Sequence, residues 1–184
     1  MITLKEEKLI VAGFGGQGVL LIGRLLAYAG MIENKHVTWI PSYGPEMRGG
    51  TANCTVVISN NEIGSPITSI PDSVIVMNQP SLDKFEPIVK EKGLLIVNSE
   101  MITRKPKRKD LDIVEIPINK IARNIGNEKV ANMVALGAYI DKKQIVKKES
   151  IYKAMKKMLP ERHQHLIPLN KKAINEGIKF LMKK

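Results

Sequence analysis

The amino-acid sequence predicts an α/β fold, a three-layer sandwich with a mainly parallel, Rossmann-like sheet and a helical C-terminal segment. Short apolar runs of strand length alternate with helical patterns through the first two thirds of the chain, which is typical of a parallel sheet covered by helices. A glycine-rich turn separates the first apolar run from the first helical pattern. No internal repeat or shift in composition divides the chain, so we expect a single domain, residues 1–184.

The first strand is expected at residues 8–12, where a short apolar run leads into glycines. Residues 19–31 then have the length and the Leu, Ala and Ile content of a helix that packs closely on a sheet. Five later strands are expected: 36–40, which Pro41 ends, 53–59, 73–77, 94–98 and 112–116. The runs at 73–77 and 94–98 are nearly continuous in apolar residues, which predicts strands buried on both faces.

A short helix or helical turn is expected between residues 80 and 90, and the C-terminal part of the chain is helical. It contains four patterns: 121–125, 131–140, 150–158 and 170–182. Pro160 and Pro168 are expected to separate the last two, because proline interrupts the hydrogen bonds of a helix interior. Four methionines at apolar helical positions are expected in the core or an interface: Met133, Met155, Met158 and Met182.

Composition indicates a globular, cytoplasmic protein. Of the 184 residues 43% are hydrophobic and 26% are charged, and no stretch approaches the ~20 apolar residues of a membrane span. The first residues lack the pattern of a signal peptide. Cys54 is the single cysteine, which excludes a disulfide within the chain and an iron–sulfur cluster held by this chain alone. Its position in a predicted strand favours a buried, inert thiol.

The net charge of +11 is concentrated at the C-terminal end. Residues 141–184 hold 13 Lys and Arg against 4 Asp and Glu. Lysines at helical spacing most often form a solvated helix face, and this is the interpretation we favour. Docking on an acidic partner and attraction of an anionic substrate are the alternatives. A nucleic-acid partner is disfavoured because aromatic residues, which stack on bases, make up only 4% of the chain.

Gly13, Gly15 and Gly18 have the spacing G-x-G-x-x-G, after a predicted strand and at the start of a predicted helix. In such a turn the glycines permit a tight bend, close approach of a phosphate, and close packing of helix on strand. The free N–H groups of the helix start favour an anion. The sequence therefore predicts a nucleotide or phosphate ligand, with a purely structural bend as the alternative.

A dinucleotide site would have an acidic residue at the end of the second strand, where this chain has Pro41 and Ser42. Because the acidic residue is missing, the sequence disfavours an NAD-dependent dehydrogenase. A glycine- and proline-rich loop follows instead, and it contains Tyr43, Glu46 and Arg48. An arginine in such a loop suits a carboxylate or phosphate, although it can also pair with an acidic residue and shape the loop. We expect the loop and the glycine turn to leave the carboxyl ends of adjacent strands, where ligands bind.

Three segments carry a resemblance to a known family: Gly13-Phe14-Gly15-Gly16-Gln17-Gly18, Ser42-Tyr43-Gly44-Pro45-Glu46-Met47-Arg48-Gly49-Gly50 and Val56-Val57-Ile58-Ser59. With these segments the sequence resembles the gamma subunit of 2-oxoacid:ferredoxin oxidoreductases. The form of the second segment is similar to the 2-oxoglutarate and branched-chain branches, which favours 2-oxoglutarate or 2-oxoisovalerate over pyruvate.

The resemblance implies a multisubunit enzyme that decarboxylates a 2-oxoacid oxidatively, reduces ferredoxin and forms acyl-CoA. No glycine in the chain is followed by aspartate, so the Gly-Asp-Gly signature of a thiamine diphosphate and magnesium site is missing. Thiamine diphosphate, magnesium and the iron–sulfur clusters would then belong to partner subunits, named alpha, beta and a ferredoxin-like delta. This chain would be inactive alone, would assemble the complex and would line part of the coenzyme A path.

The residues that the resemblance assigns to cofactor binding come from the two glycine motifs: Gly13, Gly15, Gly16, Gln17, Gly18, Ser42, Tyr43, Glu46, Arg48, Gly49 and Gly50. We expect no catalytic residue and no metal ligand on this chain. His163 and His165 are expected in a surface turn rather than a zinc site, because no Cys or carboxylate cluster accompanies them. The alternative function is a free-standing, nucleotide-binding Rossmann-like oxidoreductase, and a basic module for nucleic acid is a third hypothesis.

Overall fold

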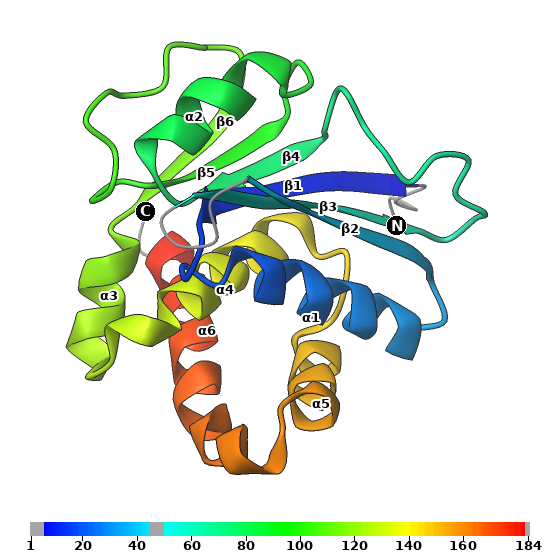
Figure 1. Cartoon of the computed structure of the whole chain (residues 1–184), viewed down its shortest axis with the longest axis vertical. Helices are drawn as coiled ribbons and strands as arrows, with labels where there is room; N and C mark the ends of the chain where they lie inside the picture. The colour runs from blue at the N-terminus through cyan, green and yellow to red at the C-terminus, as the bar shows by residue number, and fades with distance from the viewer. Residues whose placement is uncertain (1–5, 45–49, 183–184) are drawn as a thin grey trace.

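The computed structural model describes residues 6–44 and 50–182, and Figure 1 shows its arrangement. The elements follow in this order: β1 (Glu6–Phe14), α1 (Val19–Ile32), β2 (His36–Tyr43), β3 (Thr51–Ser59), β4 (Ser73–Val76), α2 (Gln79–Phe85), η1 (Glu86–Ile88), β5 (Leu94–Asn98), β6 (Asp112–Ile116), α3 (Ile118–Ile125), η2 (Glu128–Val130), α4 (Ala131–Lys143), α5 (Lys148–Met158), η3 (Glu161–Leu166) and α6 (Ile167–Met182).

One six-stranded sheet has the order β2-β3-β1-β4-β5-β6. The pairs β1–β4, β4–β5 and β5–β6 are parallel, whereas β3 runs antiparallel to both of its neighbours, β1 and β2. Three of the five pairings are therefore parallel, in agreement with the predicted class of sheet. The antiparallel half was not anticipated, and it places β3 between β1 and β2.

Helices cover both faces of the sheet, so the molecule has three layers (Figure 1). Helices α1, α4, α5 and α6 lie on one face, and α2 with the segment that follows β5 lies on the other. Successive residues of the central strands point alternately into these two layers. Val11 and Ile75 belong to the core under α1 and α4, and Ile10 and Val74 belong to the core under α2. Every residue of β4 and β5 is buried, as predicted from their continuous apolar runs.

Helices α4 and α6 cross at two glycines. A Cβ atom on Gly137 would lie 2.1 Å from the carbonyl oxygen of Ile174, and a Cβ on Gly177 would lie 2.1 Å from that of Val134. The absence of a side chain at these two positions lets the helix backbones touch, and α6 thereby holds α4 against the sheet.

The predicted elements are present, with two differences at prolines. Pro41 lies inside β2 rather than after it, which an edge strand tolerates because one side of its backbone has no partner strand. Pro168 is the second residue of α6 and does not break it, since the first turn of a helix needs no N–H donor there. Met133 and Met155 are buried in the core, and Met182, expected in the core or an interface, is 74% exposed on this chain. Within the described residues, no helix is long and apolar enough to cross a membrane.

Candidate functional site

The glycine turn joins β1 to α1 at the carboxyl edge of the sheet. Gly15 and Gly16 are exposed, and Gly16 has a φ of +98°, with open space where a side chain would stand. Gly18 caps α1 with a φ of +72°; no side chain caps the helix, and its first turn contains no acidic residue. The uncapped start of α1 therefore presents N–H donors and the positive end of the helix dipole, which suit an anion.

Gly13 and Gly18 lie where neighbouring side chains pack closely against the backbone of the turn. A Cβ on Gly13 would lie 3.0 Å from Cβ of Met77 and 2.9 Å from Cγ1 of Val19. A Cβ on Gly18 would lie 2.3 Å from Nδ2 of Asn132, which donates a hydrogen bond of 3.2 Å to the Gly18 carbonyl. These two glycines let the turn approach β4 and α4, whereas Gly15 and Gly16 leave the backbone open to solvent.

Gln17 holds the turn together from inside. Its Oε1 accepts hydrogen bonds from the Phe14 N–H at 2.7 Å and from Nδ2 of Asn78 at 3.1 Å. Its Nε2 donates to the Met77 carbonyl at 3.2 Å. The side-chain amide of Gln17, a residue predicted to bind a cofactor, links the turn to the end of β4.

The second motif meets the first through the backbone. The Gly15 N–H donates to the Gly50 carbonyl at 2.9 Å, and Tyr43, 71% exposed at the end of β2, lines a pocket of about 220 Å³ with Gly15, Gly16 and Gly18. Ser42 is exposed one residue earlier. The structure thus brings Tyr43 and Gly50 to the glycine turn, as predicted.

Three predicted site residues of the same loop, Glu46, Arg48 and Gly49, lie outside the described residues. The two motifs leave the same edge of the sheet, but they do not leave adjacent strands, as we had expected. β3 lies between β1 and β2, and Phe14 at the end of β1 pairs with Thr51 at the start of β3. The prediction was wrong on this point because strand patterns do not specify strand order.

The position of β3 is also relevant to whether the glycine turn belongs to a dinucleotide-binding site. In such a site, the strand beside β1 is parallel to it and carries the acidic residue that holds the ribose. Here β1 lies between β4, which is parallel and leads to α2 on the other face, and β3, which takes the place of that strand but is antiparallel and begins with Thr51 at this edge. The geometry agrees with the missing acid after β2, and both argue against dinucleotide binding.

A larger pocket opens on the other side of the glycine turn. β1 leads to α1 under one face of the sheet, and the neighbouring strand β4 leads to α2 over the other face (Figure 1). Ligands of open α/β sheets bind at such a switch point. A pocket of about 460 Å³ lies here, lined by Gly16, Gln17, Met77, Asn119, Asn127, Glu128, Lys129 and Ala131.

A polar network, missed by the sequence analysis, supports the wall of this pocket. Nδ2 of Asn98 donates to Oδ1 of Asn119, and Nδ2 of Asn119 donates to Oε1 of Glu128, both at 2.7 Å. Arg123 forms ion pairs with Glu128 at 3.0 Å and with Glu100 at 2.6 Å. The hydrogen bond from Asn119, with Arg123 nearby, lowers the pKa of Glu128, so this carboxylate is ionised at neutral pH.

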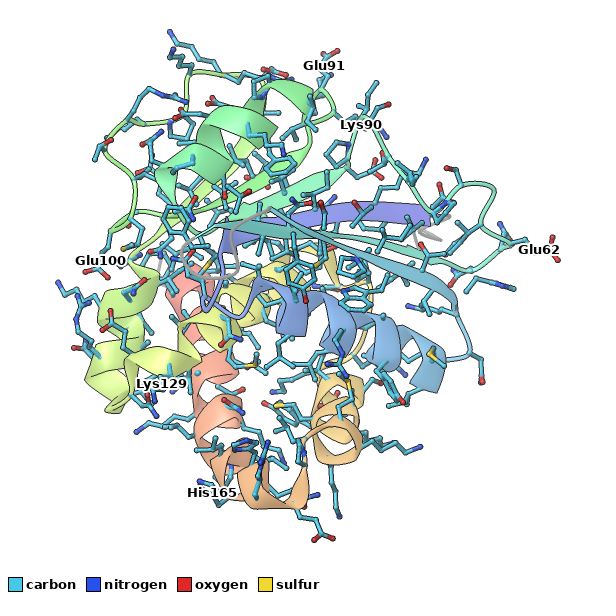
Figure 2. The ribbon with its side chains drawn as sticks, viewed as in Figure 1. Glu62, Lys90, Glu91, Glu100, Lys129 and His165 are labelled. Carbon is cyan, nitrogen blue, oxygen red and sulfur yellow. The ribbon has the colours of Figure 1, made fainter. Side chains whose placement is uncertain are left out.

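Lys129 lines the same pocket, and Figure 2 shows it with Glu100 on the α3 side of the molecule. The signal for this network was present in the sequence: Asn98 is a polar residue that closes an apolar strand run at the carboxyl edge. Its Oδ1 is buried and has no hydrogen-bond partner among the described residues.

Neither Cys54 nor the histidines of η3 form a reactive or metal-binding site in the described part of the chain. Burial raises the pKa of the Cys54 thiol to about 12, so it is not a nucleophile at neutral pH. His163 and His165 lie in η3, and no group of three or more His, Cys, Asp or Glu among the described residues is placed to hold a metal ion.

Comparison with known proteins identifies relatives of the chain. The family model described as pyruvate ferredoxin/flavodoxin oxidoreductase matches residues 8–180. Ketoisovalerate oxidoreductase subunit VorA of Methanothermobacter marburgensis is 42% identical over 133 residues, which are 72% of this chain and 28% of that protein. The 2-oxoglutarate synthase subunit KorC of Methanocaldococcus jannaschii is 37% identical over 159 residues, 85% of each chain. This chain thus spans about a quarter of VorA but most of KorC.

Solved structures agree with the fold. The keto/oxoacid ferredoxin oxidoreductase gamma subunit from Geobacter sulfurreducens PCA superimposes with a TM-score of 0.83 and 32% identity, covering 97% of this chain and 99% of that one. A 2-oxoglutarate:ferredoxin oxidoreductase from Magnetococcus marinus has a TM-score of 0.87 at 20% identity; this chain spans 31% of that chain. The same fold therefore occurs as a separate chain and as part of a longer one.

Proposed function

The chain belongs to the pyruvate ferredoxin/flavodoxin oxidoreductase family, and from that premise we propose that it is the gamma subunit of a multisubunit 2-oxoacid:ferredoxin oxidoreductase. The assembled enzyme decarboxylates a 2-oxoacid oxidatively, transfers the acyl group to coenzyme A and reduces ferredoxin. The relatives named for ketoisovalerate and 2-oxoglutarate support these two substrates over pyruvate. In this proposal residues 1–184 form one gamma-type domain of a cytoplasmic complex.

Partner subunits supply the redox chemistry in this proposal. An iron–sulfur cluster normally takes four thiolates, and this chain has one cysteine, which is buried. Thiamine diphosphate, magnesium and the clusters are therefore assigned to alpha, beta and ferredoxin-like delta subunits. Thiamine diphosphate supplies stabilisation of the carbanion left by decarboxylation. This chain would contribute to assembly and to the binding of coenzyme A.

The observation that carries the coenzyme A role is the backbone hydrogen bond from Gly15 to Gly50, which joins the two glycine motifs in one place. Beside it, Gly15 and Gly16 leave their backbone exposed, and α1 begins without a capping side chain. The Gly15 N–H is taken by the Gly50 carbonyl, so a phosphate of coenzyme A would be held by the N–H groups of Gly16 and the first turn of α1, which it can approach without displacing any side chain. Arg48 is proposed to neutralise the same phosphates.

Purification of the native protein tests the subunit assignment. We expect the chain to purify with thiamine- and cluster-bearing subunits and to show 2-oxoacid- and coenzyme A-dependent reduction of ferredoxin. A chain that purifies alone and has no such partners would contradict the proposal. Saturable binding of NAD(H) or NADP(H) by the isolated chain would instead support the free-standing oxidoreductase.

Substitution within the assembled enzyme tests the site. Gly16→Ala adds a methyl group to the exposed turn and also disfavours its positive φ, so the KM for coenzyme A should rise while the complex remains assembled. Arg48→Ala is expected to raise the same KM. Loss of the complex in either variant would assign that residue to a subunit interface. Gly64→Ala controls for the added methyl group alone, since Gly64 has open space around it, has no positive φ and lies in the loop before β4.

A further inference from the structure

The end of the molecule furthest from the sheet is a helical tip (Figure 1). It consists of α5, η3 and the first turns of α6, and Figure 2 labels His165 there. We call this surface the basic tip and define it by its exposed cations: Lys153, Lys156, Lys157, Arg162 and Lys172. Their charges are not neutralised by any ion pair within residues 6–44 and 50–182.

Two lysines of the C-terminal segment that lie nearer the sheet are paired. Lys142 forms an ion pair with Asp112 at 3.0 Å, and Lys143 forms one with Glu7 at 3.2 Å. The charge excess of this segment is thus not spread evenly. The lysines nearest the sheet serve the fold, and the basic tip retains unpaired charge.

The spacing on α5 concentrates this charge. Lys153, Lys156 and Lys157 are three and four residues apart, so they share one face of the helix. Like charges at this spacing repel each other and destabilise a helix. Glu149, four residues before Lys153, and the C-terminal end of α5, near Lys156 and Lys157, offset part of this repulsion, and an anionic partner would offset more of it.

The chemistry of the tip indicates a protein partner that binds transiently. None of the large apolar side chains that are exposed in the described chain lies on it. Its aromatic residue, Tyr152, is covered by the ammonium group of Lys171, 4.8 Å from the ring centroid, and is not free to stack on a base. Charged surfaces without an apolar centre suit short-lived complexes that form by electrostatic attraction, not permanent subunit interfaces.

We propose that the basic tip attracts and docks the acidic face of the electron-carrier protein that the assembled enzyme reduces. The inference rests on the proposed function, in which ferredoxin is the acceptor. The tip supplies attraction and orientation, and the electrons leave from partner subunits. In Figure 1 the tip lies at the end of the molecule away from the sheet, whereas the glycine turn lies at the edge of the sheet, so we expect binding of coenzyme A to be independent of the tip.

The test replaces Lys153, Lys156 and Lys157 by glutamate in the assembled enzyme. We expect the KM for ferredoxin to rise about tenfold at low ionic strength, since steering by charge changes association rates by 10-fold or more. The difference from wild type should shrink at about 1 M salt, where the Debye length is ~3 Å. The KM for coenzyme A, and the rate with the cationic dye methyl viologen at saturation, should stay within about twofold of wild type.

A matched variant controls for net charge. Lys84, Lys105 and Lys109 are exposed lysines of α2 and the segment after β5, on the opposite side of the sheet. Their replacement by glutamate changes the net charge equally and should leave the KM for ferredoxin unchanged. A second variant replaces the same three lysines by glutamine, which avoids placing three glutamates in α5. About half of the rise in the KM for ferredoxin is expected, because this variant removes the charges without reversing them.

Several results would overturn the docking proposal: an equal effect in the control variant, an unchanged KM for ferredoxin, or failure of the folded tip variants to assemble. Binding of DNA that is lost with the tip charges, with the KM for ferredoxin unaltered, would assign the tip to nucleic acid. Failure of the proposed function is distinguishable, because the wild-type complex would then not reduce methyl viologen in a 2-oxoacid- and coenzyme A-dependent manner.

Discussion

Gln17 separates a structural role from a ligand-binding role within the glycine turn. Gln17→Leu keeps the approximate size of the side chain and removes three hydrogen bonds, to Phe14, Asn78 and Met77. A hydrogen bond contributes about 1 kcal/mol net, which sets an upper value of about 3 kcal/mol. Because the side chain is only half-buried, water can reach some of the freed groups, and we expect a loss of about 2 kcal/mol.

Urea unfolding of the isolated chain measures this loss, and thermal unfolding should show a decrease in Tm of about 4–8 °C for a domain of this size. Gln17→Glu retains the acceptor but cannot donate to the Met77 carbonyl, so an intermediate loss is expected. Gln164→Leu in η3 is the control, since its one hydrogen bond, to the Lys156 carbonyl, is 3.5 Å long. A loss below about 0.5 kcal/mol for Gln17→Leu would refute the structural role, because surface substitutions typically change stability by that much.

Three further predictions concern the core. Gly137→Ala should destabilise the chain by about 2 kcal/mol or more in urea unfolding, because its Cβ would meet the Ile174 carbonyl at 2.1 Å; retained stability would contradict the tight crossing. Cys54 should resist a thiol reagent at pH 8 until the chain unfolds, since the pKa of its thiol is about 12; rapid labelling of the native chain would show that the site opens. Burial raises the pKa of Glu7 above its ordinary value of 4.5, so the folded state holds this proton more tightly. Stability should therefore fall as pH rises from 4.5 through the folded pKa, and Glu7→Gln should remove this component; equal slopes in the two proteins would refute it.

The local structure was largely predictable from the sequence, because it depends on patterns that neighbouring residues decide. The apolar runs at 73–77 and 94–98 fell on β4 and β5, and the glycine spacing fell on the turn between β1 and α1. Pro168 was misjudged because a proline has opposite effects in the first turn and in the interior of a helix. Only the true start of α6, at Ile167, distinguishes these two cases.

The candidate site was predictable in its backbone and less so in its side chains. The pattern that places glycines at a turn does not specify which glycine faces a ligand and which packs against a helix. Gln17 and Gly18 are oriented by Met77 and Asn132, which are 60 and 114 residues away in the chain. Contacts between residues so far apart in the chain depend on the tertiary fold. The residues next to Gln17 in the sequence therefore could not show whether its side chain faces a ligand or the protein.

The antiparallel pairing of β2 with β3 could have been derived from one length. β2 ends at Tyr43 and β3 begins at Thr51, which leaves seven residues between them. A parallel crossover needs a dozen or more residues, whereas an antiparallel connection needs only a few. A hairpin of β2 and β3 follows, and pairing of β3 with β1 then leaves β2 at the edge, pointing the same way as β1. That arrangement returns both glycine motifs to one edge of the sheet, where Gly15 and Gly50 meet, so the antiparallel strand that removes the dinucleotide site is also what joins the two motifs.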